Sequence, residues 1–183
     1  MSVAPALTYD DLSSLPQDDH LRRELIDGEL FVSPSPGRRH QRAVARITAA
    51  LLAHVDEHGG EVLPTPADVY FSAHAVVEPD VLYVGAARVD QLTDDRFTDI
   101  APDLVVEVSS PATRRLDLID KRGLYEREGV AEYWFVDLDA DHVDVHRLDA
   151  EGRYGLPATL GPDATLTCLA APGFVLAAAE LFR

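Results

Sequence analysis

The spacing of apolar residues along the chain predicts two long helices. In residues 37–58, apolar side chains recur at intervals of three and four positions, which places them on one face of a helix. This stripe consists of Val44, Ile47, Leu51, Leu52 and Val55. A similar pattern covers residues 113–128, and glycines follow both segments, as is common at helix ends. We expect the first long helix to pack onto a β-sheet, and a short helix to cover residues 8–15.

Strand patterns fill most of the remaining chain. The pair Asp27–Gly28 between two apolar runs predicts a β-hairpin, because glycine tolerates a positive φ. The nearly continuous apolar run 104–109 predicts a central strand that is buried on both faces. Further strands are predicted at residues 61–63, 68–71, 76–84, 132–137 and 142–148, followed by short strands and turns. The length of 183 residues and this mixture of elements favour one α/β domain over residues 1–183.

One carboxylate interrupts the most apolar of these strands. Glu107 stands in the sequence Leu-Val-Val-Glu-Val, where burial of an unpaired charge is costly. The period-two alternation of a strand places Asp103, Val105, Glu107 and Ser109 on one face. We expect this face to open into a cleft. The alternatives are an edge strand with Glu107 in water, or a buried salt bridge.

Asp80 is a second carboxylate within an apolar segment, directly after Pro79. Proline is tolerated at the start of a strand, so Asp80 is expected near a sheet end; a turn or capping role is the alternative. Two carboxylates from neighbouring strands suit Mg²⁺, which prefers oxygen ligands and can stabilise charge on a phosphoryl oxygen. Lys121 is the only lysine and can orient water or stabilise developing charge. Its alternative role is a solvated pair with Asp117 on the same helix.

The net charge bears directly on a nucleic-acid function. The chain has 16 lysine and arginine residues and 32 aspartate and glutamate residues, which gives a net charge of −16. Nucleic-acid binders usually carry a basic face, because phosphate neutralisation supplies much of their affinity. Two arginine clusters are candidates for a local phosphate-facing surface, although ordinary solvated arginines are the alternative: Arg38, Arg39 and Arg42, and Arg114 and Arg115.

The single cysteine, Cys168, excludes an internal disulfide and leaves a cysteine-based metal site without partners. It fits a reducing, cytoplasmic setting. No stretch reaches the roughly 18 apolar residues that span a bilayer, and residues 1–7 have no basic leader. We therefore expect a cytoplasmic protein without a membrane partner.

Several short motifs follow one another in a specific order. They are 23–29 (RELIDGE), Ser33-Pro34 with His40-Gln41, 78–81 (EPDV), 102–111 (PDLVVEVSSP), Asp117-Leu118, Lys121-Arg122 with Tyr125, and 129–137 (GVAEYWFVD). In this order they resemble the Uma-two family of putative restriction endonucleases. The resemblance runs from about residue 8 to residue 182, and that family in turn resembles the PD-(D/E)XK nuclease superfamily.

The resemblance implies a restriction-endonuclease-like mixed β-sheet core flanked by helices, with additional N- and C-terminal β-strands. It also implies phosphodiester cleavage with Mg²⁺ or Mn²⁺, a nucleic-acid partner that we expect to be DNA, and a homodimer.

By position, Asp80 matches the first acid of the superfamily pattern and Glu107 the second, so both are the implied metal ligands. Ser109 stands where the parent pattern has its lysine, and Lys121 matches the place to which this family displaces that lysine. Glu24 matches an early family glutamate that could complete the metal shell; an exposed strand glutamate is its alternative.

Three functions follow as hypotheses. The first is a metal-dependent endonuclease in which Asp80 and Glu107 bind the metal, Lys121 assists and Glu24 supports. The second is a catalytically silent binding or assembly module on the same fold, which the charge of −16 favours. The third is a metal-dependent hydrolase of a small substrate other than nucleic acid.

Overall fold

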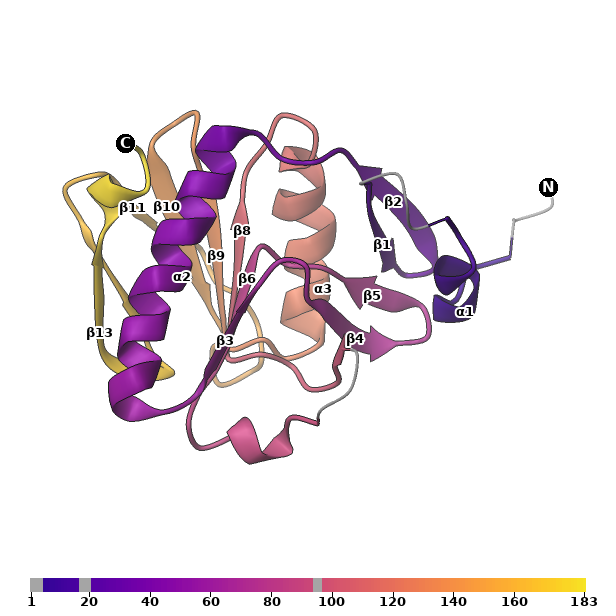
Figure 1. Ribbon diagram of the computed structural model, residues 1–183, viewed down its shortest axis with the longest axis horizontal. Helices are drawn as coiled ribbons and strands as arrows, with labels where there is room; N and C mark the ends of the chain where they lie inside the picture. The colour runs from indigo at the N-terminus through magenta and orange to yellow at the C-terminus, as the bar shows by residue number, and fades with distance from the viewer. Residues whose placement is uncertain (1–4, 17–20, 94–96) are drawn as a thin grey trace.

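The computed structural model describes residues 5–16, 21–93 and 97–183. Their strands form a six-stranded sheet in the order β11-β10-β9-β8-β6-β3, a five-stranded sheet in the order β2-β1-β5-β4-β7, and the β12–β13 hairpin. Figure 1 shows the long helix α2 along the larger sheet, with the β1–β2 hairpin and α1 at the side of the N-terminus. The fold is therefore the expected mixed β-sheet core flanked by helices.

The bounds of the elements agree with most of the predicted ones. The helices are α1 (Tyr9–Ser13), α2 (Arg38–His58), η1 (Val89–Gln91), the π-helical segment η2 (Leu116–Lys121), α3 (Arg122–Arg127) and η3 (Ala178–Glu180). The strands of the first half are β1 (Arg22–Ile26), β2 (Glu29–Ser33), β3 (Glu61–Pro64), β4 (Asp68–Ser72), β5 (Ala75–Val77), β6 (Val81–Val84) and β7 (Phe97–Thr98). The strands of the second half are β8 (Leu104–Val108), β9 (Glu132–Asp137), β10 (His142–Arg147), β11 (Ala158–Leu160), β12 (Thr165–Cys168) and β13 (Ala171–Ala177).

Strand β8 is the central strand that the apolar run predicts. It pairs antiparallel with β6 and parallel with β9, and all five of its residues are buried. A parallel pair requires a crossover connection, which η2 and α3 supply between β8 and β9. The two faces of β8 belong to different cores, since Val106 packs on the α2 side and Val105 on the α3 side.

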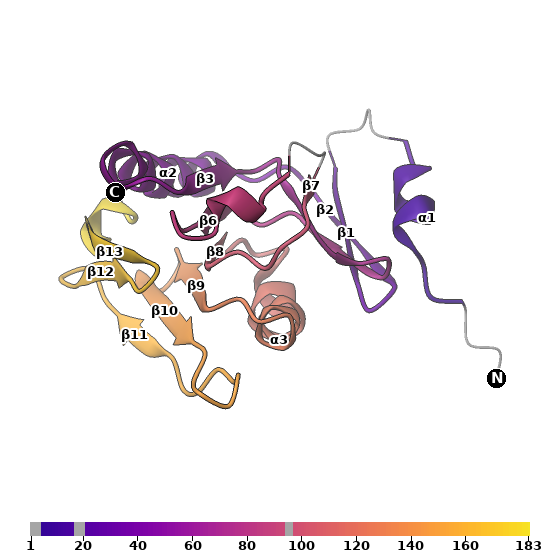
Figure 2. The same ribbon diagram turned by 90° about the horizontal axis from the view of Figure 1, so that it is seen from below.

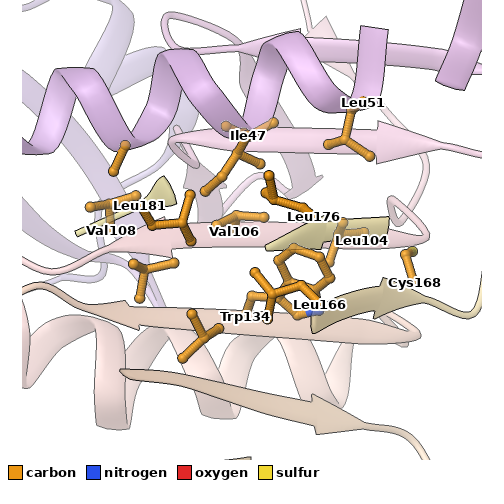
Figure 3. Close-up of a cluster of buried hydrophobic side chains, with 14 of the residues drawn as sticks. Ile47, Leu51, Leu104, Val106, Val108, Trp134, Leu166, Cys168, Leu176 and Leu181 are labelled. Carbon is orange, nitrogen blue, oxygen red and sulfur yellow. The ribbon is translucent and has the colours of Figure 1, made fainter. Parts of the chain in front are cut away.

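Helix α2 covers one face of the large sheet through its apolar stripe. Ile47 and Leu51 are fully buried against β8 and β9, together with Leu166 and Leu176 of the β12–β13 hairpin (Figure 3). The prediction for Leu52 is wrong, because its side chain is 46% exposed. Adjacent residues of a helix point about 100° apart, so the sheet buries Leu51 and leaves its neighbour toward solvent.

The predicted strand 76–84 is in fact two strands that lie in different sheets. β5 belongs to the five-stranded sheet and β6 to the six-stranded sheet. Pro79, which has no N–H for a ladder, lies between them. This crossing places Asp80 at the start of β6, where the two sheets meet.

Among the described residues, no helix is both long and apolar enough to cross a membrane.

Candidate active site

The four residues predicted for the site lie in one cluster. The pairing of Val81 with Val106 places Asp80 and Glu107 at facing positions of β6 and β8. The Nζ atom of Lys121 lies 2.8 Å from Glu107 Oε1 and 2.6 Å from Glu24 Oε1. Strand β1 of the smaller sheet supplies Glu24, so the cluster joins both sheets and the η2 segment.

The cluster is buried, which corrects the expectation of an open cleft beside Glu107. The residues Glu24, Asp80, Glu107 and Lys121 are each 1% exposed. The alternatives of a solvated helix lysine and an exposed strand glutamate are therefore also wrong. The buried salt bridge that we gave as an alternative for Glu107 is present.

The π-helical segment brings two charged side chains into this interior. Leu116, Asp117 and Lys121 are its buried residues, and π turns often occur at functional sites. Asp117 Oδ1 lies 4.0 Å from Lys121 Nζ. The predicted pair between them exists, although it lies in the core rather than on the surface.

Three donors hold the Asp80 carboxylate. Arg22 Nη2 donates to Oδ1 at 2.9 Å, while His40 Nε2 at 3.0 Å and the backbone N–H of Val108 at 2.8 Å contact Oδ2. Burial raises the pKa of Asp80, but the contacts with His40 and Arg22 outweigh it and hold this pKa below its usual value. Asp80 is therefore ionised in the fold.

Glu107 and Asp117 behave differently. Lys121 and the Tyr125 hydroxyl, at 2.6 Å, both donate to Glu107 Oε1. Burial nevertheless raises the pKa of Glu107 to about 8, with Lys121 opposing the rise. Burial likewise raises the pKa of Asp117 to about 6, and its buried Oδ2 has no hydrogen-bond partner within the described ranges.

The cluster contains more acid than base. Four carboxylates, those of Glu24, Asp80, Glu107 and Asp117, share the interior with the cations Arg22 and Lys121. Burial lowers the pKa of Lys121, but the attraction of Glu107 and Glu24 outweighs burial and raises this pKa overall. Lys121 therefore keeps its proton in the fold and serves as a hydrogen-bond donor.

Comparison with known families identifies the relationship. The model of the Uma2 family, described as putative restriction endonucleases, matches residues 9–179. The chain belongs to this family.

The solved structures agree with this result. A crystal structure of a putative nuclease belonging to DUF820 from Anabaena variabilis ATCC 29413 superposes with a TM-score of 0.80. The two proteins share 20% identity over 96% of this chain and 97% of the other, so the likeness shows a common fold. No curated protein matches the chain.

The sequence analysis did not predict two members of this acidic cluster. Arg22, which is the main cationic partner of Asp80, was not considered, although its period-two spacing with Glu24 places both on one face of β1. His40 was named in the sequence analysis, but its contact with Asp80 was not predicted. The sequence signal for His40 was its position on the buried side of the α2 stripe, four residues before Val44.

One arginine of each predicted cluster pairs with an aspartate outside this site. Arg39 pairs with Asp141 at 2.8 Å, and Arg114 pairs with Asp137 at 2.5 Å. Each guanidinium therefore already has an acidic partner within the chain, which reduces what it can offer to a phosphate.

The donor set suits a divalent cation in charge and in ligand type. The excess of carboxylates, the raised pKa values of Glu107 and Asp117, and the unpartnered Oδ2 of Asp117 are each relieved by a hard cation. In the described part of the chain, however, no group of three or more histidine, cysteine, aspartate or glutamate side chains is arranged to hold a metal ion. Lys121 and Arg22 supply the positive charge in this arrangement.

Proposed function

We propose that this chain is a metal-dependent endonuclease that hydrolyses phosphodiester bonds of nucleic acid with Mg²⁺ or Mn²⁺. The observation that carries the proposal is the buried acidic cluster around Lys121, with Asp80 and Glu107 on facing strands. Membership of a family of putative restriction endonucleases supports the nuclease reaction and a nucleic-acid substrate.

The residues of the cluster have separate roles in this proposal. Asp80 and Glu107 would hold the cation, and Asp117 offers a further oxygen. The bound cation would supply stabilisation of charge on a phosphoryl oxygen and would lower the pKa of its water. Lys121 keeps its proton and donates to developing negative charge. Glu24 positions the ammonium group of Lys121 through its 2.6 Å contact.

A cavity of about 490 Å³ offers a route from the surface toward Asp80. Arg22 and Glu78 line it, together with Ser35 from the segment before α2 and Gln41 from the first turn of α2. Arg22 donates to the backbone oxygen of Glu78 at 2.6 Å as well as to Asp80. We propose that a phosphate approaches through this cavity and meets the Arg22 guanidinium first.

The silent binding or assembly module is the second candidate, and a specific observation favours it. Both oxygens of Asp80 already accept bonds from protein donors, and Lys121 occupies the position beside Glu107 that a cation would use. A buried ion-pair network of this kind can serve structure alone.

Cleavage assays with matched variants separate the candidates. Plasmid DNA, linear duplex DNA, single-stranded DNA and RNA are each incubated with Mg²⁺ or Mn²⁺. Asp80→Asn and Glu107→Gln should lower cleavage at least about 100-fold. Asp103 also follows a proline, as Asp80 does, but it forms an ion pair with Arg88 at 2.6 Å outside the cluster. Asp103→Asn is therefore the control and should leave cleavage unchanged.

Two results would reject the endonuclease. One is a wild-type protein that cleaves none of these substrates with either metal. The other is cleavage that persists unchanged in both Asp80→Asn and Glu107→Gln. Hydrolysis of a simple phosphodiester alone would indicate the small-substrate hydrolase.

We also propose further properties of this protein. We propose a single domain over residues 1–183, a homodimer that acts on DNA, and a cytoplasmic location. Light scattering after size exclusion tests the dimer, since a monomeric mass across a concentration series contradicts it.

A further inference from the structure

A second cavity lies at the other end of α2, and the proposed function does not use it. It measures about 440 Å³, is open to solvent and is bordered by the last turns of α2, the segment after β6 and the turn between β12 and β13. Figure 2 views the molecule from this end, with α2, β6 and the β12–β13 hairpin in sight. His54, Tyr83 and Ala86 are among its lining residues.

The cavity is separate from the acidic cluster. The five residue steps from Asp80 to Gly85, which run along β6, span roughly 17 Å. The two sites also lie on opposite faces of the sheet. Leu82, which shares a strand face with Asp80, packs in the α3-side core, whereas Tyr83 packs in the α2-side core. Along α2, the 14 residues from His40 to His54 correspond to about 21 Å.

Two polar side chains reach this cavity without a protein partner. Tyr83 is 1% exposed and His54 is 8% exposed. Within the part of the chain that the structure describes, neither the Tyr83 hydroxyl nor a ring nitrogen of His54 makes a hydrogen bond. Because they line an open cavity rather than the closed interior, both groups are free to bond a ligand that enters it.

The walls around these groups are aromatic and apolar. The rings of His54 and His58 stack at 4.3 Å with an interplanar angle of 8°, and Tyr83 meets His54 edge-on at 6.4 Å. Ala86 and Ala87 leave space beside them. Such a surface favours flat, polarisable ligands over flexible aliphatic ones.

The charges that line the cavity further limit the class of ligand that it can bind. Asp103 and Arg88 also line the cavity, but they neutralise one another at 2.6 Å. Burial and the neighbouring His58 lower the pKa of His54, so its ring is neutral near neutral pH. The cavity therefore has no surplus charge, and an uncharged group suits it best.

We propose that this cavity binds a small, uncharged, planar heteroaromatic group of the nucleobase class, hydrogen-bonded by Tyr83 and His54 and walled by Ala86 and His58. A nucleobase has donors and acceptors along its edge, which match a hydroxyl and a neutral imidazole, and a π-face for the stacked rings. The group arrives either as a free nucleoside or as an unstacked base of a nucleic-acid strand.

Calorimetry on the full chain tests the proposal. Adenosine, guanosine, cytidine, uridine and a mixed-sequence single-stranded oligonucleotide are titrated separately, without divalent metal. At least one nucleoside should bind with a Kd below about 1 mM. Ala86→Phe fills the cavity from an exposed position and should weaken binding more than tenfold. Tyr83→Phe removes one hydrogen bond and should weaken it about three- to tenfold.

Matched controls keep the result interpretable. Ala53→Phe adds the same ring at an exposed position of α2 outside the cavity and should bind like the wild type. Asp80→Asn should also bind normally, so this test stands apart from the endonuclease assay. Circular dichroism confirms that Ala86→Phe and Tyr83→Phe are folded.

Each outcome is decisive. If only the oligonucleotide binds, and Ala86→Phe weakens it, the group comes from a strand and the proposal stands. If no nucleoside or oligonucleotide binds, the proposal is wrong. It is also wrong if Ala86→Phe and Tyr83→Phe both bind as tightly as the wild type. Binding of Zn²⁺ alone that is lost in His58→Ala would also overturn it, since the cavity would then be a metal site.

Discussion

Replacing Glu107 by glutamine should stabilise the protein at alkaline pH while it abolishes any metal-dependent cleavage. Burial raises the pKa of Glu107 from 4.5 to about 8, because the interior disfavours the charged carboxylate more than Lys121 favours it. A group whose folded-state pKa is raised stabilises the fold below its unfolded pKa. That stability is lost as pH rises from about 4.5 toward 8.

The magnitude follows from the size of the pKa change. One pKa unit corresponds to about 1.36 kcal/mol, so the wild type loses on the order of 5 kcal/mol across this pH window. Glutamine has the same shape and stays neutral, so Glu107→Gln does not suffer this loss. The variant should therefore gain on the wild type by as much as about 1.4 kcal/mol per pH unit between pH 5 and pH 8.

Urea denaturation at pH 5, 6, 7 and 8 measures this difference. Trp134 is the only tryptophan and is fully buried, so its fluorescence reports unfolding directly. The exposed Glu29→Gln serves as a control, and its stability profile should run parallel to that of the wild type. Parallel profiles for Glu107→Gln and the wild type would refute the reasoning, because the buried carboxylate would then titrate normally.

Three further changes test other parts of the structure by the same measurement. Lys121→Met should cost about 3–5 kcal/mol at pH 8, because it leaves two carboxylates buried without their cation, and less at pH 5, where Glu107 is protonated; an equal cost at both pH values would contradict this account. Arg22→Met should cost about 3 kcal/mol at pH 7 and little below pH 4, since the stability from the lowered pKa of Asp80 is lost as pH falls; a cost that persists in acid would show that packing dominates. Ile47→Ala should cost about 2–5 kcal/mol by opening a core cavity, whereas Leu52→Ala, one residue along the helix, should cost under about 0.5 kcal/mol.

Local patterns in the sequence predicted most elements and the central members of the site. The apolar stripe on α2, the hairpin at Asp27–Gly28 and the buried strand around Glu107 follow from periodicity and turn chemistry, which act over a few residues. The ordered motifs correctly indicated the family, and with it the positions of Asp80 and Lys121 in one cluster.

The environment of those residues depends on contacts between distant segments. Arg22 and Asp80 are 58 positions apart, and the crossing at Pro79 brings them together by moving the chain from one sheet to the other. Because no local pattern encodes such an approach, the sequence indicated an open cleft where the fold has a closed network. The cavity at the far end of α2 likewise combines residues from α2, β6 and the β12–β13 turn.

The sequence by itself thus determined which elements form, which family the chain resembles and which acidic residues are candidates for catalysis. Only the tertiary structure decided that these acids are buried, which donors hold them, and that the pKa values of Asp80 and Glu107 move in opposite directions. The physical reason is that secondary structure responds to short-range spacing, whereas desolvation and charge pairing depend on neighbours that only the folded chain supplies.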